Sequence, residues 1–351
     1  MAQNVIYTVL LGLVFKNSSS KQSHKRMKLL FLFLDGIGLG KDDPTINPFI
    51  RAYLPNLDHL LEGNKIIAND LHMNSNGEHI YIHTPLASLL SLDACLGIDG
   101  TPQSASGQAS LLTGKNISAF LGYHDGPKPT PEIMKILKEG TLFSHLNQNG
   151  REASLLNAYP PRYFKSIETG HRLPGVIALS ASYAGMKLKT MDNLIQGNAI
   201  STDFTAQGWH DHLGLLDIPL LTPRQAGERI WKLSSEYDLA FFEYWLTDIA
   251  GHQQDMQSAC DLLATFDEVL GSLLNSWDDG ERLILITSDH GNLEDLSVRR
   301  HTQNDVPLLL IGSHELRMQF IHELYRVNGT KNSFDLTVIS PTIINLIETI
   351  K

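Results

Sequence analysis

The sequence predicts an α/β fold in which helices sandwich a doubly wound, mostly parallel sheet. Three hydrophobic runs carry this prediction. They are rich in Leu, Ile and Phe and show little alternation of polar and apolar residues, which is typical of strands covered on both faces. Segments with helical signals alternate with such runs, as expected when helices connect parallel strands. The three runs are residues 28–34, 239–247 and 282–288.

An aspartate follows each of these runs directly, namely Asp35, Asp248 and Asp289. Ligands of parallel sheets bind outside the carboxyl ends of the strands, so we expect the three carboxylates to lie together there. Carboxylates gathered in one place repel one another strongly unless a cation lies among them. The sequence therefore predicts a metal-dependent enzyme.

The remaining elements are predicted from capping signals and from the spacing of apolar residues. The longest helix has a continuous apolar stripe, which we assign to core packing. The segment 160–221 is the least regular part, and we expect it to form a lid over the site. Helices are predicted at 55–61, at 131–149 with a break at Gly140, at 223–235 after the Thr222 cap, at 255–277 and at 341–350; further strands are predicted near 152–157 and at 306–311.

Composition narrows the function classes. A chain of 351 residues can bury a large core, and its net charge of -10, with 28 basic residues spread along it, argues against nucleic-acid binding. Cys95 and Cys260 are too few for a disulfide framework, which favours a reducing compartment and a cytoplasmic location. Nothing in the sequence indicates an oligomeric state.

The first 26 residues precede the first predicted strand and contain an apolar run at 5–15. This run is too short to span a bilayer, and it lacks the preceding basic residues and the cleavage site of a signal peptide. Because Met27 stands directly before the first strand, we expect residues 1–26 to be a dispensable extension and 27–351 to form the enzyme domain. Secretion or membrane anchoring is the alternative; we expect no stable membrane association.

The candidate nucleophile lies in the small-residue segment 101–114. A serine at the start of a helix lies near the positive end of the helix dipole, where free N–H groups can receive a phosphate. Ser104 and Ser106 both meet this condition. Taken alone, the segment is better explained by serines that cap a helix.

Five motifs occur in the order found in the alkaline phosphatase superfamily: Asp35-Gly36, the Ser104 segment ending at Gly114, Asp248-x3-His252, Asp289-His290-Gly291-Asn292, and His301-Thr302-x3-Val306-Pro307. The chain resembles this superfamily over residues 28–350, and within it the branch of cofactor-independent phosphoglycerate mutase and phosphopentomutase. The resemblance implies one metal held by Asp35, Ser104, Asp289 and His290, and a second held by Asp248, His252 and His301. It also implies that Ser104, ten residues before Gly114, is the nucleophile and that Ser106 is not.

The resemblance implies a phosphoserine intermediate and two divalent metal ions. Hard carboxylates with three imidazoles suit Mn²⁺ or Zn²⁺ better than Mg²⁺. Relatives that act as mutases carry a cap domain inserted after the nucleophile helix, whereas here only 26 residues separate Gly114 from Thr141. We therefore expect no large mutase-type cap, and a phosphatase-like hydrolase of a small phosphorylated metabolite; a phosphomutase is the alternative.

Two other interpretations are weaker. Gly36-Ile-Gly38-Leu-Gly40 after a strand is similar to a dinucleotide fingerprint, but Lys41 replaces the last glycine and no helix opens after it. A non-catalytic metal-binding pseudoenzyme would be expected to have lost ligands, and all seven are present. Substrate contacts are suggested by charge or position alone for Lys115, His124, Arg162, Arg172, Arg299 and Arg300.

Overall fold

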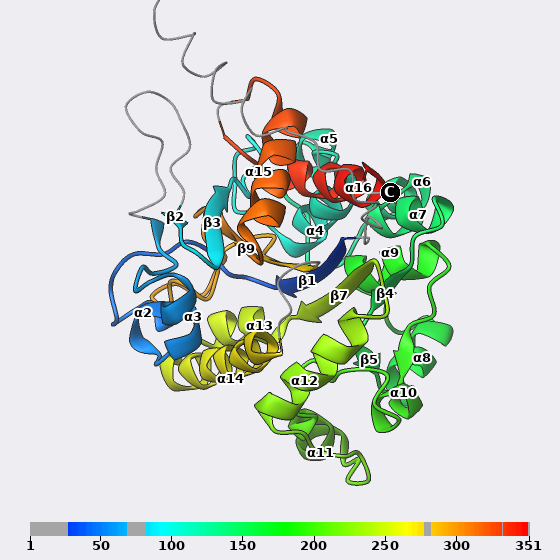
Figure 1. Cartoon of the computed structure of the whole chain (residues 1–351). Helices are drawn as coiled ribbons and strands as arrows, with labels where there is room; N and C mark the ends of the chain where they lie inside the picture. Colours follow the sequence, from blue (N-terminus) through cyan, green and yellow to red (C-terminus); the bar gives the residue numbers. More distant parts are fainter. Residues whose placement is uncertain (1–26, 69–81, 277–281, 332, 350–351) are drawn as a thin grey trace, which may run out of the picture.

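The computed structural model describes residues 27–68, 82–276, 282–331 and 333–349 (Figure 1). The expected N-terminal extension, residues 1–26, lies outside the described residues. None of the helices in the described part of the chain is long and apolar enough to cross a membrane.

A seven-stranded mixed sheet forms the centre of the molecule, with the strand order β2-β3-β9-β8-β1-β7-β4 (Figure 1). Strands β8, β1, β7 and β4 are parallel neighbours, whereas β9 runs antiparallel between β8 and β3, and β2 runs antiparallel to β3. The mostly parallel sheet is therefore confirmed. The strands are β1 (Lys28–Leu34), β2 (Ile82–His83), β3 (Ala87–Leu92), β4 (Ala153–Leu155), β7 (Leu239–Tyr244), β8 (Arg282–Thr287) and β9 (Val306–Ile311).

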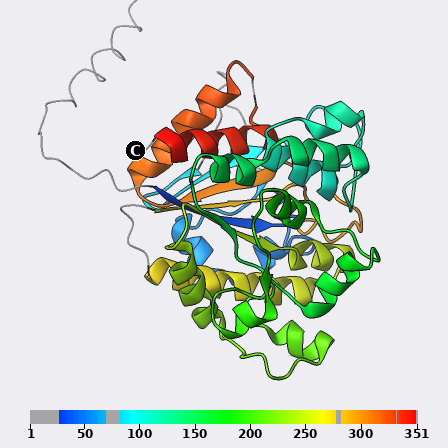
Figure 2. The same ribbon diagram turned by 90° about the vertical axis from the view of Figure 1, so that its right-hand side faces the viewer.

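Helices cover both faces of the sheet, as Figure 2 shows. Alternate residues of β1 enter two different cores: Phe31 and Phe33 pack into one, and Leu30 and Leu32 into the other. The first core contains residues of α4 (Ser104–Thr113), α5 (Ile117–Leu121), α6 (Pro131–Glu139), α7 (Leu142–Gln148), α8 (Pro161–Glu168), α9 (Val176–Tyr183), α15 (His314–Asn328) and α16 (Ile339–Thr349). The second contains residues of α2 (Pro48–Arg51), α3 (Pro55–Leu60), α12 (Pro223–Ser234), α13 (Leu246–Gln253) and α14 (Met256–Asn275).

The predicted strand at 239–247 is shorter than expected. Strand β7 ends at Tyr244, and Asp248 lies in the first turn of α13 instead of directly after the strand. The Thr247 hydroxyl donates to the Tyr244 carbonyl at 2.9 Å and to the Asp35 carbonyl at 2.6 Å, which fastens the start of the helix to the end of β1. Asp248 and His252 are consequently four residues apart on one helix face.

The segment expected to be irregular contains four helices and a short strand. Residues 160–221 form α8, α9, β6 (Lys189–Thr190), α10 (Met191–Ile195) and α11 (Gln207–Leu213), and β6 pairs with β5 (Ala158–Tyr159). Part of the segment has a small core of its own around Trp209, separate from the two cores on the main sheet.

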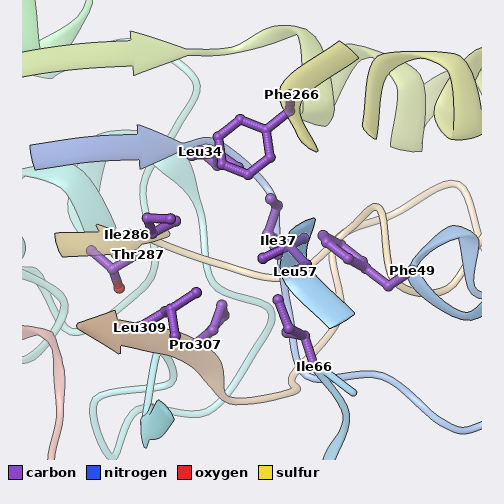
Figure 3. A pocket seen from close by; sticks show the side chains of 10 residues that line it. All are labelled: Leu34, Ile37, Phe49, Leu57, Ile66, Phe266, Ile286, Thr287, Pro307 and Leu309. Atoms are coloured by element: carbon purple, nitrogen blue, oxygen red, sulfur yellow. The ribbon is translucent and has the colours of Figure 1, made fainter. Parts of the chain in front are cut away.

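A small apolar cavity lies at the carboxyl end of β1, where Leu34, Ile37 and Phe266 converge (Figure 3). Its volume is about 20 Å³, and Thr287 supplies the one side-chain hydroxyl of its lining. A space of this size holds at most a water molecule, and a water would find few polar partners there. We therefore interpret it as imperfect packing, not as a binding site.

Candidate metal centre and substrate cleft

The structure brings all seven predicted ligand residues together at the carboxyl ends of the central strands β1 and β8. Asp35 follows β1, Ser104 begins α4, Asp248 and His252 lie on α13, Asp289 and His290 follow β8, and His301 lies in the loop before β9. The carboxyl ends of β1 and β8 thus meet the starts of two helices, which is the placement that the strand pattern predicted.

Around His290, one nitrogen faces three oxygens. His290 Nε2 lies 3.0 Å from Ser104 Oγ, 3.3 Å from Asp35 Oδ1 and 3.7 Å from Asp289 Oδ2. Asp35 Oδ1 and Asp289 Oδ2 are buried and have no hydrogen-bond partner among the residues that the structure describes. A buried carboxylate oxygen without a partner is costly, and a cation at this point would satisfy both. The donor set therefore fits a metal ion.

A second set surrounds Asp248. Its Oδ2 lies 3.4 Å from His252 Nε2, and its Oδ1 lies 3.4 Å from His301 Nε2. The two imidazole Nε2 atoms are 3.1 Å apart. The His290 ring stacks on His301 with centroids 3.7 Å apart, so the two sets adjoin, and His290 can be grouped with Asp248 and His301 as well as with Asp35 and Asp289.

Each imidazole has its Nδ1 turned toward a backbone carbonyl. The Nδ1 atoms of His252 and His301 lie 2.8 Å from the carbonyls of Arg299 and Pro102, and His290 Nδ1 lies 3.4 Å from that of Gly291. Because a carbonyl can only accept, Nδ1 carries a proton, and Nε2 is the nitrogen that can offer a lone pair to a metal once its own proton is lost. Such an outer hydrogen bond fixes the tautomer and orientation of a metal-ligating histidine.

Like charges and burial perturb the ionisation of the set. Burial raises the pKa of Asp35 well above its usual range, and the carboxylates of Asp289 and Asp248 raise it further. Burial also favours a high pKa for Asp248, but hydrogen bonding from His301 and the charge of His290 outweigh it and lower the pKa to about 2. Protons and imidazoles here occupy the places that a divalent cation would take, so metal binding would release protons.

Two glycines of the predicted motifs are required by close approaches. Gly36 has φ +70°, and a Cβ on it would lie 2.8 Å from Asp248 Oδ1. A Cβ on Gly251 would lie 2.6 Å from the side chain of Asn292. Asn292 in turn donates to Asp248 Oδ1 at 2.7 Å, so Gly251 leaves room for the residue that orients this ligand.

Sequence reasoning missed several residues that hold the ligands in place. Gln108 donates to Asp35 Oδ2 at 3.2 Å. Glu294 is completely buried and connects three loops, because its carboxylate accepts from Gly38 N at 2.9 Å, Asn292 N at 2.8 Å, Asn304 Nδ2 at 2.9 Å and the Thr302 hydroxyl. Its position five residues after Asp289 carries no recognisable signal, although a carboxylate in an otherwise buried stretch is a reason to look for partners.

A cleft of about 820 Å³ opens beside the centre. Asp35, Ser104 and Asp248 line one end, and residues between 158 and 213 form much of the remaining wall. Two of the arginines suggested by charge, Arg162 and Arg172, line this cleft. Its volume lies within the usual range for small-molecule sites.

The other suggested substrate contacts do not line this cleft. Lys115 forms an ion pair with Glu139 at 2.9 Å, and His124 is held by Ser118 at 3.0 Å and by the Ile98 carbonyl at 3.2 Å. Arg299 lines a separate hollow of about 460 Å³ next to His252. Arg300 is exposed, and within the described part of the chain no contact of its side chain suggests a role.

Comparisons with known proteins agree with this geometry. Residues 224–350 match the family model of the Metalloenzyme superfamily. A 2,3-bisphosphoglycerate-independent phosphoglycerate mutase of Desulforudis audaxviator is 30% identical over 100 residues, which cover 27% of this chain and 20% of that protein. The protein of the same name from Ignicoccus hospitalis is 35% identical over 79 residues, covering 22% and 18%. The matched part thus spans about a fifth of the length of these curated relatives.

Two solved structures share the fold. The PH0037 protein from Pyrococcus horikoshii superposes with a TM-score of 0.52 at 16% identity, covering 92% of this chain and 97% of that one. A mutant of the alkaline phosphatase from the Antarctic bacterium TAB5 gives a TM-score of 0.50 at 11% identity, covering 92% and 99%. The expected resemblance is confirmed to this extent: residues 224–350 match the model of the Metalloenzyme superfamily, and over most of its length the chain shares the fold of an alkaline phosphatase.

Proposed function

We propose that this protein is a two-metal phosphoryl-transfer enzyme that forms a phosphoserine on Ser104 and acts as a phosphatase-like hydrolase of a small phosphorylated metabolite. The observation that carries the proposal is the position of Ser104. Its Oγ lies 3.0 Å from His290 Nε2, among the candidate metal ligands and at the end of the cleft.

We assign one metal to Asp35, Ser104, Asp289 and His290 and the other to Asp248, His252 and His301. When bound, two divalent ions neutralise phosphate charge and make a serine hydroxyl easier to ionise. The imidazoles favour Mn²⁺ or Zn²⁺ over Mg²⁺. From the cysteine usage, with Cys95 and Cys260 both free, we also infer a reducing, cytoplasmic compartment.

The surroundings of the two serines support Ser104 as the nucleophile. Ser104 is the first residue of the ten-residue helix α4, so its oxygen lies at the positive end of that helix. Ser106 is already engaged, because its hydroxyl donates to the Gln103 carbonyl at 3.2 Å and accepts from Asp125 N at 3.0 Å. Ser106 therefore acts as a tether for the loop at Asp125.

The connection after the nucleophile helix favours hydrolysis over a mutase reaction. Between Gly114 and Thr141 the chain forms α5 and α6, which pack on the main core and insert no separate domain. A mutase must keep water from the phosphoserine until the substrate has reoriented. We propose that residues 160–221 act as a partial lid and that water reaches the intermediate. The phosphoglycerate mutase names of the relatives make the mutase reaction the second candidate.

The decisive experiment measures released phosphate and isomerised product side by side. Phosphomonoesters, phosphodiesters, phosphoglycerates and pentose phosphates are supplied with Mn²⁺ or Zn²⁺. We expect free phosphate from at least one monoester, loss of this activity in Ser104→Ala, and only a modest loss in Ser106→Ala. Trapped label on Ser106, or isomerisation with no phosphate released, would contradict the proposal.

A further inference from the structure

The side chain of Asn157 continues the sheet beyond the end of β4. Strand β4 ends at Leu155, and the next backbone bond to β7 runs from Leu156 N to the Phe241 carbonyl at 2.8 Å. Beyond this point the Asn157 Oδ1 atom accepts from Glu243 N, and its Nδ2 donates to the Glu243 carbonyl, both at 2.8 Å. A side-chain amide has the donor and the acceptor of a peptide group. Asn157 therefore gives Glu243 both of the bonds that a longer β4 would have given it.

The chain leaves the main sheet and returns to it at this point. Residues 156–158 and 200–202 form a neck of two short segments, joined by backbone hydrogen bonds of 2.8 and 2.9 Å. These bonds occupy the backbone groups of the first segment that would otherwise continue the ladder toward Glu243. On the returning segment, the Thr202 hydroxyl donates to the same Glu243 carbonyl as Asn157, at 3.1 Å. Both halves of the neck therefore meet the backbone of Glu243, and the chain between them forms α8, α9, β6 and α10.

The next residue of β7 supports both candidate metal sites. The Tyr244 carbonyl accepts from Asp35 N at 3.1 Å and from the Thr247 hydroxyl at 2.9 Å. Asp35 belongs to the first set of candidate ligands. Thr247 lies in the first turn of α13, which carries Asp248 of the second set. One backbone carbonyl thus holds a ligand of one set and the start of the helix that presents the other.

Peptide planarity connects the neck to this carbonyl. Each peptide unit is rigid, so only the φ and ψ torsions of each residue can vary. Asn157 bonds to the peptide units on both sides of Glu243, through the N–H of one and the C=O of the other. The Tyr244 carbonyl can then turn only about the torsions of Tyr244 itself. A functional side chain must stay within about 0.5 Å of its working position, so a small rotation at this carbonyl is enough to disturb both ligand sets.

Burial shows that Asn157 acts through its neighbours. Its side chain is completely buried, whereas Thr202 and Glu243 line the cleft. The residues around it, Leu156 and Ile200, belong to the second apolar core. A buried amide is costly in such a place unless its hydrogen bonds are made, and here they are made to Glu243. The amide is therefore explained by the backbone that it holds.

We propose that Asn157 is a positioning residue that couples the neck of the lid to both sets of candidate metal ligands. This inference rests on the metal assignment made in the proposed function. Coupling between two sites is reciprocal: if the bonds of Asn157 raise metal affinity by some factor, metal binding stabilises the closed neck by the same factor. A substrate held by the lid then also tightens the ligands around the two ions.

The metal affinity of two matched variants tests the coupling. Asn157→Leu keeps the approximate size of the side chain and removes both bonds to Glu243. Asn116→Leu is the control, because Asn116 also bonds one backbone N–H and one backbone carbonyl, both at 2.8 Å, at the start of α5. We expect Asn157→Leu to weaken Mn²⁺ binding at both sites about tenfold, as is usual when a residue that orients metal ligands is lost. Asn116→Leu should leave it unchanged; titration of the chelator-treated full chain measures both.

The absorption spectrum of bound Co²⁺ separates positioning from stability. Both variants should lower the melting temperature, since each leaves two backbone groups without their partner. The Co²⁺ bands report the geometry of the ligands and should change only in Asn157→Leu. If Asn157→Leu does not fold, Asn157→Asp replaces it. This variant keeps the acceptor for Glu243 N, loses the donor to the Glu243 carbonyl, and should weaken Mn²⁺ binding in the same direction.

Hydrogen exchange tests the reciprocal effect. The N–H groups of Ala158 and Ile200 close the neck. Adding Mn²⁺ should slow their exchange about tenfold in the wild type and leave it nearly unchanged in Asn157→Leu, because the coupling factor is the same in both directions.

The outcomes separate the positioning role from the proposed function. If ions bind but no phosphate is released from any substrate, the hydrolase proposal fails while the positioning role stands. Equal Mn²⁺ affinity in the wild type and Asn157→Leu overturns the positioning role while the function stands, and so does exchange at Ala158 and Ile200 that does not respond to the metal. A wild type that binds no divalent ion overturns the metal assignment and the coupling together.

Discussion

Glu243 should make the metal-free protein less stable as the pH rises toward neutrality. It is the second-last residue of β7, faces the cleft and pairs in register with Phe33 of β1. Burial raises its pKa from 4.5 to about 7; the charge of Lys128 opposes this and that of Asp289 adds to it. The folded protein thus keeps a proton that the unfolded chain has already released between these two pH values.

The sign and size follow from linkage. A carboxyl group whose pKa is higher in the folded state costs nothing at low pH, and its cost is fully present above the folded pKa. A difference between 4.5 and about 7 corresponds to about 3 kcal/mol of unfolding free energy lost between pH 4.5 and pH 7. Because Glu243 keeps some solvent contact, we take this as an upper value.

Glu243→Gln removes the titration and keeps the side-chain shape. The free energy of unfolding of Glu243→Gln relative to wild type should therefore rise with pH by up to about 3 kcal/mol between pH 4.5 and 7.5. Urea unfolding over this range, in excess chelator, measures it. The chelator is needed because bound cations would lower the pKa of Glu243.

An exposed carboxylate provides the matched control. Glu268 lies on the solvent side of α14, and Glu268→Gln should leave the pH profile parallel to that of the wild type. If the profile of Glu243→Gln also runs parallel to the wild-type profile, Glu243 ionises normally in the folded protein.

Three further outcomes are expected. Purified protein should carry about two divalent ions per chain by elemental analysis, and Asp289→Ala and His252→Ala should each lose about one. Chelation should lower the free energy of unfolding by about 4 kcal/mol for each site at which the free metal concentration was about a thousand times the dissociation constant. A chelated protein that keeps both its activity and its melting temperature would refute the metal assignment. Glu294→Gln should lower the free energy of unfolding by about 1–3 kcal/mol and weaken metal binding, because the substitution removes a buried carboxylate that accepts hydrogen bonds from three loops. Urea unfolding and metal titration measure the two effects. Unchanged values would mean that the loops hold their positions without the Glu294 carboxylate. A chain that begins at Met27 should be soluble and as active as the full chain, since β1 starts at Lys28; an insoluble product would show that residues 1–26 are needed.

The parts of the fold that the sequence predicts are those in which one segment determines its own structure. The Leu- and Phe-rich runs at 28–34 and 282–288 form strands because both of their faces are buried, and this burial is visible in the run itself. The Thr222 cap and the proline after it likewise place α12, and the apolar stripe places α14, to within one or two residues at each end. Since parallel strands end at one edge, the aspartates after these strands could be placed together before any contact was known.

Prediction fails where several segments decide the structure together. The antiparallel direction of β9 depends on which strands flank it, and its own apolar sequence is compatible with either direction. Helix α9 shows no amphipathic stripe because six of its eight residues are buried, so the region around it looked irregular. Asp248 lies in a helix instead of at a strand end, where Thr247 donates to two carbonyls, one of them directly after a different strand.

The same reasoning separates the two kinds of functional residue in this molecule. Metal ligands can be recognised in a sequence because their chemistry needs several residue types at fixed spacings, and a lost member would be noticed. Glu294 has no such spacing, since it matters through the loops that meet at it. These loops come together only after the chain has folded. Residues that hold candidate ligands in place are therefore found from the structure and not from motifs.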